Sequence, residues 1–335
     1  MHNFKNKIAV VGGGSWATAN VKMLDDNATD KEIFWWMRNQ QAVEHIHKFK
    51  HNPNYLSSVE INVPAQNIST DLKNLIKKAD FLLLNVPAAF IKEALIGVTP
   101  EDLTGKKVIS AIKGMVPDEN QIVGDFLNQR FGVSFENFIV ISGPCHAEEV
   151  ALEKLSYLTI ASGDTELAAR FASMISTRYI KTIISDDIYG TEYGAVLKNI
   201  YAVASGICHG LGYGDNFQAV LISNAIRELE RFVAAVHPIN RDIKETAYLG
   251  DLMVTAYSQF SRNRTFGNMI GKGYTVKSAQ LEMNMIAEGF YAVNSLHQVN
   301  KQYNVYMPIC NAVYAILYQK MPPAPEMKHL AELLG

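Results

Sequence analysis

Hydrophobic residues in the first half of the chain occur as short unbroken runs that alternate with segments of helical periodicity. The runs predict strands at Lys7–Val11, Glu32–Met37, Phe81–Val86, Lys107–Ile112 and Phe138–Ser142, with later candidates at Leu158–Ala161 and Ile180–Ile184. The segments between them predict helices at Ser15–Leu24, Gln40–Phe49, Leu72–Lys77, Phe90–Ile96 and Glu119–Gln129. Strands that are apolar along their whole length are buried on both faces, so the alternation predicts a largely parallel, doubly wound α/β sheet of the Rossmann type.

The pattern changes after Ser185, where strand-like runs become scarce. Apolar positions with helical spacing predict helices at Ala195–Cys208, Val220–Val236, Asp251–Ser258, Lys277–Glu282, Ile286–Val299 and Ile309–Gln319, and a short last helix after the stiff connector Pro322–Pro325. Glycines such as Gly210 and Gly271 cluster at the breaks between these segments. We therefore predict two domains: residues 1–187 bind a dinucleotide, and residues 188–335 form an all-α domain with the substrate-binding and catalytic residues.

Composition and charge limit the function further. The 335 residues are enough for two domains, and 48% hydrophobic with 19% charged residues is typical of a soluble globular protein. A net charge of -2 argues against nucleic acid as a partner. Three scattered cysteines fit a reducing compartment. Residues 1–6 lack the layout of a signal peptide, and no apolar run reaches the roughly 18 residues of a membrane span, so we expect a cytoplasmic protein.

The turn after the first predicted strand carries the pattern G-x-G-x-x-A at Gly12, Gly14 and Ala17. The first glycine permits a tight strand-to-helix turn, and the second lets a pyrophosphate approach the backbone. The alanine keeps the helix close to the sheet, and the free N–H groups of the first helical turn then face the negative charge. A plain tight turn would look similar, but the flanking strand and helix favour dinucleotide binding.

The end of the second predicted strand bears on the choice between NAD and NADP. An acidic residue there binds the ribose hydroxyls, whereas an arginine accommodates the 2′-phosphate. No Asp or Glu follows this strand, and Arg38 does. The pattern favours NADP over NAD, with an ordinary surface arginine as the alternative.

Two later strands end in residues that can face a ligand, because ligands bind at the carboxyl ends of strands in doubly wound sheets. Lys113 follows one such strand, although a solvated loop lysine is equally compatible with its position. The next strand ends at Gly143, where a turn into a helix would aim N–H groups at an anion. Cys145 is followed by His146, but adjacent side chains rarely point at one another, so we expect no cysteine nucleophile.

Lys198 is the most informative side chain of the helical half, because it is the only charged residue in the stretch 194–206. Burial of an ammonium group is costly and lowers its pKa. A lysine shifted toward neutrality can exchange protons with a substrate near pH 7. The alternative is a lysine whose ammonium reaches solvent along one helix face.

Two later clusters can complete a site. Asp251 begins a predicted helix and Thr255 follows one turn later, although an aspartate at a helix N-terminus is common for structural reasons. Ser261, Arg262 and Asn263 place hydroxyl, guanidinium and amide donors together, which suits a phosphate group. A solvated basic turn is the alternative for this cluster.

Some other residues carry no predicted site. His45, His47 and His51 have no acidic or thiol partner, and only His47 and His51 share a helical face, so we predict no metal site. Trp35 and Trp36 lie within a predicted strand, where core packing explains them.

Several short motifs, each modest alone, occur together along nearly the whole chain. They are Gly12–Thr18, Lys113–Gly114, Ile141–Pro144, Leu197–Asn199, Gly250–Leu252, Ser261–Arg264 and Ile286–Gly289. In this order and spacing they make the chain resemble the NAD(P)-dependent glycerol-3-phosphate dehydrogenases of the bacterial type. That family interconverts dihydroxyacetone phosphate and sn-glycerol 3-phosphate, and so supplies glycerol 3-phosphate for phospholipid synthesis.

The resemblance implies a role for each matching residue. The dinucleotide would be bound by Gly12, Gly14, Ser15, Trp16, Arg38, Lys113, Ala147, Arg262, Ile286 and Glu288. The substrate would be bound by Lys113, Gly143, Cys145, Lys198, Asp251, Thr255, Ser261, Arg262 and Asn263. Lys198 would donate the proton in reduction and accept it in oxidation, with Lys113 and Asp251 as the other catalytic residues.

One substrate contact departs from the family's pattern. The family usually has Ser or Thr followed by an aromatic residue where this chain has Cys145 and His146. A thiol is a weaker hydrogen-bond donor than a hydroxyl, so this contact is expected to be weaker. The segment Trp36–Arg38 matches the Trp-x-Arg with which the family often begins the segment at the strand end.

Two other functions are compatible with these patterns. A related two-domain dehydrogenase would act on a hydroxy acid or a hydroxyacyl thioester, and a bulky thioester would not need the Ser261–Asn263 cluster. A nicotinamide-sensing protein would bind the cofactor without turnover, which the presence of Lys113, Lys198 and Asp251 disfavours. The high apolar content of the helical half is compatible with a homodimer.

Overall fold

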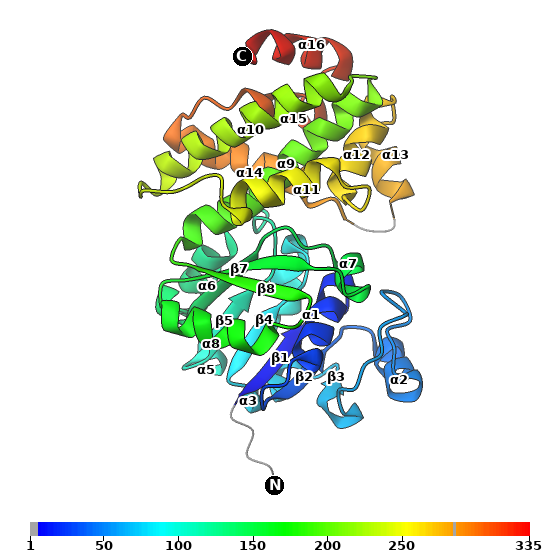
Figure 1. The fold of residues 1–335 in the computed structure, drawn as a ribbon, viewed down its shortest axis with the longest axis vertical. Helices are drawn as coiled ribbons and strands as arrows, with labels where there is room; N and C mark the ends of the chain where they lie inside the picture. The colour runs from blue at the N-terminus through cyan, green and yellow to red at the C-terminus, as the bar shows by residue number, and fades with distance from the viewer. Residues whose placement is uncertain (1–5, 284–285) are drawn as a thin grey trace. The chain divides into compact units, whose positions relative to one another are not determined.

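The structure is a computed structural model that describes residues 6–283 and 286–335. The chain forms two compact units (Figure 1). The sheet unit comprises the chain up to Ile112 together with Val123–Ile188, and the helical unit comprises Lys113–Ile122 and Tyr189–Gly335. The sequence places 113–122 with the sheet, but Met115 and Ile122 are buried in the core of the helical unit. The expectation for the N-terminal leader falls on residues that, except for Asn6, lie outside the described part of the chain.

The sheet unit contains an eight-stranded sheet with the order β3-β2-β1-β4-β5-β6-β7-β8 (Figure 1). The strands are β1 Lys7–Val11, β2 Glu32–Trp36, β3 Ile68–Ser69, β4 Phe81–Leu84, β5 Lys107–Ser110, β6 Phe138–Ser142, β7 Ser156–Ser162 and β8 Ile180–Ser185. All neighbouring strands are parallel except β6 and β7, which are antiparallel. The largely parallel α/β fold is therefore confirmed; the two-residue strand β3 carried too few apolar positions to be predicted.

Helices connect these strands. They are α1 Ser15–Asp26, α2 Gln40–Phe49, α3 Leu72–Lys78, α4 Ile91–Ala94, α5 Pro100–Leu103, α6 Val123–Phe131, α7 Ala147–Ala151 and α8 Thr165–Ile175, with 3-10 turns at Ala65–Asn67, Ala88–Phe90 and Phe135–Asn137. The helix predicted from Glu119 begins later, because Asp118 and Asn120 adopt positive φ values. The prediction omitted α8, although Asp164 caps its first turn through the backbone N–H groups of Glu166 and Leu167.

The core of the sheet unit explains the two tryptophans of β2. Trp35 is fully buried and its indole N–H donates to the carbonyl oxygen of Gly12 at 2.7 Å. The indole N–H of Trp36 donates to the carbonyl oxygen of Thr70 at 2.9 Å. Packing within the strand therefore accounts for both rings, as predicted, and the first of them also fixes the glycine turn.

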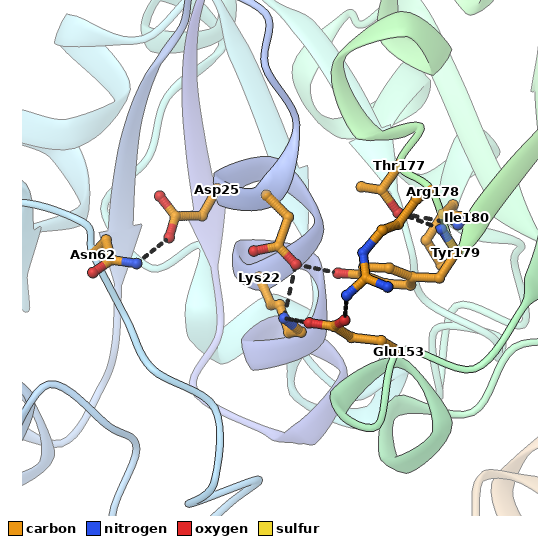
Figure 2. Close-up of polar contacts among 9 residues, drawn as sticks. Lys22, Asp25, Asn62, Glu153, Thr177, Arg178, Tyr179 and Ile180 are labelled. Carbon is orange, nitrogen blue, oxygen red and sulfur yellow. Dashed lines mark hydrogen bonds and ion pairs between the residues drawn. The ribbon is translucent and has the colours of Figure 1, made fainter.

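A polar cluster lies at the C-terminal end of α1 (Figure 2). The ammonium group of Lys22 pairs with the carboxylates of Asp26 at 2.7 Å and Glu153 at 3.0 Å. Asp26 also accepts a hydrogen bond from the hydroxyl of Tyr179, and Glu153 pairs with Arg178. Single partly exposed pairs stabilise a protein little, but a network joins its segments. This one ties α1 to the turn after α7 and to the turn before β8.

The described part of the helical unit contains helices without any named strand. They are α9 Ile188–Gly210, α10 Asp215–Val236, α11 Asp251–Tyr257, α12 Arg262–Gly271, α13 Val276–Glu282, α14 Glu288–Tyr303, α15 Pro308–Tyr318 and α16 Pro323–Leu333, with a π-helical turn η4 at Thr246–Gly250. The predicted connector Pro322–Pro325 is wrong, because α16 begins at Pro323. Proline is accepted in a first helical turn, where its missing N–H would have no intrahelical partner.

Glycines bring α9 and α12 into backbone contact. Gly206 and Gly210 on α9 face Gly267 and Gly271 on α12. A Cβ atom built on Gly206 or Gly267 would lie 2.1 Å from a carbonyl oxygen of the other helix. Gly210 and Gly271 do lie at breaks between helices, as predicted. They are the final residues of their helices, and they let the two backbones touch.

Among the described residues, no helix combines the length and the apolar character needed to cross a membrane.

Candidate active site

Three charged side chains meet in the helical unit. Lys198 lies on α9 and is 4% exposed, and Asp251 is the first residue of α11 and is 1% exposed. The Lys198 ammonium pairs with Oδ1 of Asp251. The ammonium of Lys113 lies 3.2 Å from Oδ2 of the same carboxylate. One buried carboxylate thus holds two ammonium groups, and the alternative of a Lys198 ammonium in solvent is wrong.

The electrostatics of this cluster follow from burial and from its excess of positive charge. Burial lowers the pKa of Lys198, the Asp251 carboxylate opposes that shift, and the positive charge of Lys113 adds to it. Burial alone would raise the pKa of Asp251, but the charges of Lys113 and Lys198 outweigh it and hold the pKa below its ordinary value. Asp251 is therefore ionised at neutral pH, and Lys198 gives up its proton more readily than an exposed lysine.

Local structure positions the carboxylate. The π-helical turn Thr246–Gly250 leads directly into α11, so Asp251 stands where the chain changes from a wide to a normal helical turn. The hydroxyl of Thr255 donates to the backbone carbonyl of Asp251 at 2.6 Å. Thr255 lies within reach of the cluster, as expected, but its single hydroxyl proton is used by the backbone.

Asn199 is a site residue to which the sequence motif assigned no role. It is 5% exposed, and its amide donates to the backbone carbonyl of Lys113 at 2.7 Å. The amide of Asn263 donates to the side-chain oxygen of Asn199 at 2.9 Å, and the Asn263 oxygen accepts from the N–H of Gly289 at 2.9 Å. This chain of hydrogen bonds links the 113–122 segment to α9, α12 and α14. Its only signal in the sequence was an amide beside Lys198 in an apolar stretch.

The residues predicted to hold a phosphate lie at the start of α12, where two of the three are buried. Ser261 is buried, and its hydroxyl oxygen accepts from the N–H of Arg264 at 3.3 Å as the N-cap. Arg262 is exposed, whereas Asn263 is buried and bonded at both ends of its amide. The guanidinium of Arg262 and the second N–H of the Asn263 amide are hydrogen-bond donors at this helix start.

Two further predicted cofactor residues belong to the helical unit. Glu288 is the first residue of α14 and is half-buried, and Ile286 lies two residues before it with similar exposure. Gly289 next to them packs against the backbone of α9, where a Cβ atom would lie 2.6 Å from the carbonyl oxygen of Asn199. The start of α14 is therefore held close to the Lys198–Asn199 turn of α9.

The glycine turn of the sheet unit fits a dinucleotide. Gly12 adopts a φ of +130°, and a Cβ atom there would lie 2.9 Å from the carbonyl oxygen of Asn85. Among the described residues, no atom beyond its own chain neighbours lies within 4 Å of the Cβ position of Gly14, the residue before α1, so its surroundings are open. Ser15 is 7% exposed and begins α1, whose first turn has no side-chain cap. Open space beside uncapped N–H groups is what a pyrophosphate requires, so the residues fit the cofactor.

Arg38 lies beyond the end of β2, and its acidic partner comes from the helix α4. Its guanidinium is 2.9 Å from the carboxylate of Glu93 on α4, and its Cζ atom is 6.0 Å from the ring centroid of Phe90. The Arg38 and Glu93 side chains are 71% and 51% exposed. Arg38 is thus a surface residue, but one held in an ion pair at this edge of the sheet.

The end of β6 also carries predicted site residues. Gly143 adopts a φ of +111°, and a Cβ atom there would lie 2.8 Å from the carbonyl oxygen of Tyr157. Cys145 and Ala147 are buried, and Ala147 is the first residue of α7. The turn into a helix expected after β6 is therefore present, with the Cys145 thiol two residues before it.

The histidines near α2 are arranged differently from the prediction. The rings of His45 and His51 lie 4.8 Å apart, whereas Nε2 of His47 lies 3.2 Å from the carbonyl oxygen of Ile68. Lys50 adopts the left-handed conformation and ends the helix, so His47 and His51 do not share a helical face. Within residues 6–283 and 286–335, no His, Cys, Asp and Glu side chains group in a way that would hold a metal ion.

A Rossmann-type sheet with an open glycine turn, together with a helical unit that buries a lysine against an aspartate, defines a nicotinamide-dependent dehydrogenase. Family models for the N-terminus and the C-terminus of NAD-dependent glycerol-3-phosphate dehydrogenase match residues 7–168 and 187–328. The chain belongs to this family.

Individual relatives agree with the family models. A glycerol-3-phosphate dehydrogenase [NAD(P)+] of Staphylococcus carnosus is 33% identical over 97% of both chains. The crystal structure of a glycerol-3-phosphate dehydrogenase from Coxiella burnetii has a TM-score of 0.90 at 26% identity, and the match covers 98% of this chain and 99% of that one. A D-mandelate dehydrogenase structure has a TM-score of 0.59 at 18% identity over 98% of this chain and all of that one, which is a likeness of fold alone.

Proposed function

We propose that this protein interconverts dihydroxyacetone phosphate and sn-glycerol 3-phosphate with NAD or NADP. The observation that carries the proposal is the buried Lys198–Asp251–Lys113 cluster in a chain of this family. Burying charged groups costs folding free energy, and a protein that only binds a nucleotide would gain nothing in return. Acid–base work on a substrate gives a reason for it, which favours an enzyme over a nicotinamide-sensing protein.

Lys198 is the proposed acid and base. A bound dihydronicotinamide would supply the hydride for reduction of the ketone and would be oxidised in return, so the residues described here would meet negative charge on the carbonyl oxygen. The Lys198 ammonium donates a proton to that oxygen, and its lowered pKa makes the transfer favourable near neutral pH. Lys113 adds a second positive charge that stabilises the oxygen, while Asp251 keeps both ammonium groups in place.

The phosphate is the proposed handle for positioning. Arg262, the hydroxyl of Ser261 and the second N–H of Asn263 donate to its oxygens. Binding free energy from this remote group holds the reacting carbon in place and lowers the barrier. A hydroxyacyl thioester would not use these donors, so the start of α12 favours a phosphorylated substrate.

Residues beyond the glycine turn are also proposed to contact the dinucleotide. In the sheet unit the proposed contacts are Gly12, Gly14, Ser15, Trp16, Arg38 and Ala147, and in the helical unit they are Lys113, Arg262, Ile286 and Glu288. Gly143, Cys145 and Thr255 are proposed to contact the substrate. Of these, Cys145 offers only a weak thiol donor.

The biological setting follows from the reaction. We propose that the protein acts in the cytoplasm, where it supplies glycerol 3-phosphate for phospholipid synthesis. We also propose a homodimer, which light scattering of the purified chain would test.

The test is oxidation of NADPH and NADH with dihydroxyacetone phosphate, compared with unphosphorylated dihydroxyacetone. We expect turnover with the phosphate ester and a large loss without it. Lys198→Ala should abolish turnover and leave cofactor binding largely intact, whereas the exposed Lys328→Ala should change neither. Turnover near the wild-type rate in Lys198→Ala would refute the assigned role of this lysine.

A further inference from the structure

We infer that Glu93 sets the discrimination between NADP and NAD in this chain. This inference rests on the proposed binding of a nicotinamide dinucleotide by the sheet unit. It concerns a residue on α4 that no motif in the sequence singled out, and it depends on the pairing of Glu93 with Arg38.

The topology places the two side chains at one edge of the sheet. β2 and β4 lie on either side of β1, and all three are parallel, so their carboxyl ends share the edge of the Gly12 turn. Arg38 follows β2 by two residues. Glu93 follows β4 through the 3-10 turn Ala88–Phe90, and its carboxylate reaches the guanidinium at 2.9 Å.

The pair combines a side chain that suits NAD with one that suits NADP. An acid near the end of the second strand accepts hydrogen bonds from the ribose hydroxyls of NAD, and an arginine there binds the 2′-phosphate of NADP. This chain has the arginine after β2 and receives the acid from the β4 side. The side chains of Arg38 and Glu93 are 71% and 51% exposed, so a nucleotide can reach both.

The pair would therefore affect the two cofactors in opposite directions. A 2′-phosphate carries a charge of about -1.5 to -2 near pH 7. To bind the Arg38 guanidinium, this phosphate would have to replace Glu93 as its partner. The phosphate would then lie next to a carboxylate of like charge. Exposed ion pairs are weak, so the phosphate can displace Glu93 from Arg38. Repulsion between the phosphate and the Glu93 carboxylate then lowers the affinity of the protein for NADP. A ribose without the phosphate meets no repulsion and finds an acceptor in the same carboxylate.

Glu93→Gln tests this inference without changing the size of the side chain. The probes are 2′,5′-ADP and 5′-ADP, titrated calorimetrically into the full-length protein, so the readout does not depend on turnover. We expect the variant to bind 2′,5′-ADP roughly threefold to tenfold more tightly than the wild type, as expected for removal of one charge at a solvated site. We expect 5′-ADP affinity to stay equal or to fall. The gain should shrink at high salt.

Glu166→Gln is the matched control, because Glu166 is also exposed in the sheet unit but lies on α8. This variant makes the same change in net charge and should leave both affinities unchanged. The ratio of NADPH to NADH binding should move in the same direction as the ratio of the two fragments. An unchanged affinity ratio in Glu93→Gln, or an equal gain for both nucleotides, would overturn the role of Glu93. Failure of the wild-type protein to bind any of these nucleotides would instead refute the dinucleotide function itself.

Discussion

Glu228 in the helical unit is predicted to make the stability of the protein fall as pH rises from mildly acidic to neutral. The side chain lies on α10 with 0% exposure, and its two oxygens accept hydrogen bonds from the N–H groups of Ile309 at 2.8 Å and Cys310 at 3.0 Å in the first turn of α15. Burial raises the pKa of Glu228 from 4.5 to about 7, although the thiol of Cys310 and both N–H groups oppose the shift. The perturbation is Glu228→Gln, which removes the titration.

The magnitude follows from proton linkage. The folded state binds the proton more strongly than the unfolded state, so this group's contribution to the free energy of unfolding is full below pH 4.5. That contribution is lost as pH rises through 7. The pKa difference, 7 - 4.5 = 2.5, corresponds to about 3 kcal/mol at roughly 1.4 kcal/mol per unit. Glutamine also has one oxygen for two N–H donors, which costs about 1–3 kcal/mol at every pH and leaves the slope unaffected.

The assay is urea unfolding of wild type and Glu228→Gln at pH 5 and pH 8, followed by far-UV circular dichroism. Tryptophan fluorescence would report on the sheet unit, because Trp16, Trp35 and Trp36 are the only tryptophans in the chain. The stability advantage of wild type should shrink by about 2–3 kcal/mol between pH 5 and pH 8, since a small part of the contribution is already lost at pH 5. Glu230→Gln, an exposed neighbour on α10, should show the same pH dependence as wild type. If Glu228→Gln also does so, the reasoning is refuted.

Three other predictions concern the site and its support. Asp251→Asn should lower kcat and move the pH profile of ketone reduction to lower pH, since loss of the carboxylate further lowers the pKa of Lys198. An unchanged pH profile would contradict the electrostatic effect of Asp251 on Lys198. Arg262→Ala should raise KM for dihydroxyacetone phosphate with little effect on unphosphorylated dihydroxyacetone, and an unchanged KM would contradict the phosphate contact. Gly206→Ala should destabilise the helical unit by about 2–4 kcal/mol in thermal unfolding, since its Cβ would lie 2.1 Å from a carbonyl oxygen. Gly214→Ala, which has open space, is the control and should unfold near the wild-type temperature.

The site illustrates which residues a sequence reveals. Lys198 was found because a lone charge in an apolar helix is costly unless it is used. Asn199 was given no role, because burying an amide costs little free energy once the amide is hydrogen-bonded. Its hydrogen-bond partners lie 86 and 64 residues away along the chain. Hydrogen bonds between distant segments leave no local pattern.

The choice of cofactor shows the same limit. The rule for the end of β2 considers only the residues that follow that strand, and there it finds Arg38 without an acid. The acid comes from α4, 55 residues later, because the sheet order places β4 beside β1. Sheet order depends on how strands pair, so neighbours across the sheet are absent from any local window of sequence.

Sequence alone determined the alternation of buried strands and helices, the glycine turn at Gly12 and the change to an all-helical second half. Each of these depends on local periodicity or on backbone freedom. Tertiary structure alone decided that the 113–122 segment joins the helical unit, that one carboxylate of Asp251 holds two lysines, and that glycines let α9 and α12 touch. These features arise from packing between segments far apart in the chain, where the free energy depends on which surfaces meet rather than on either segment by itself.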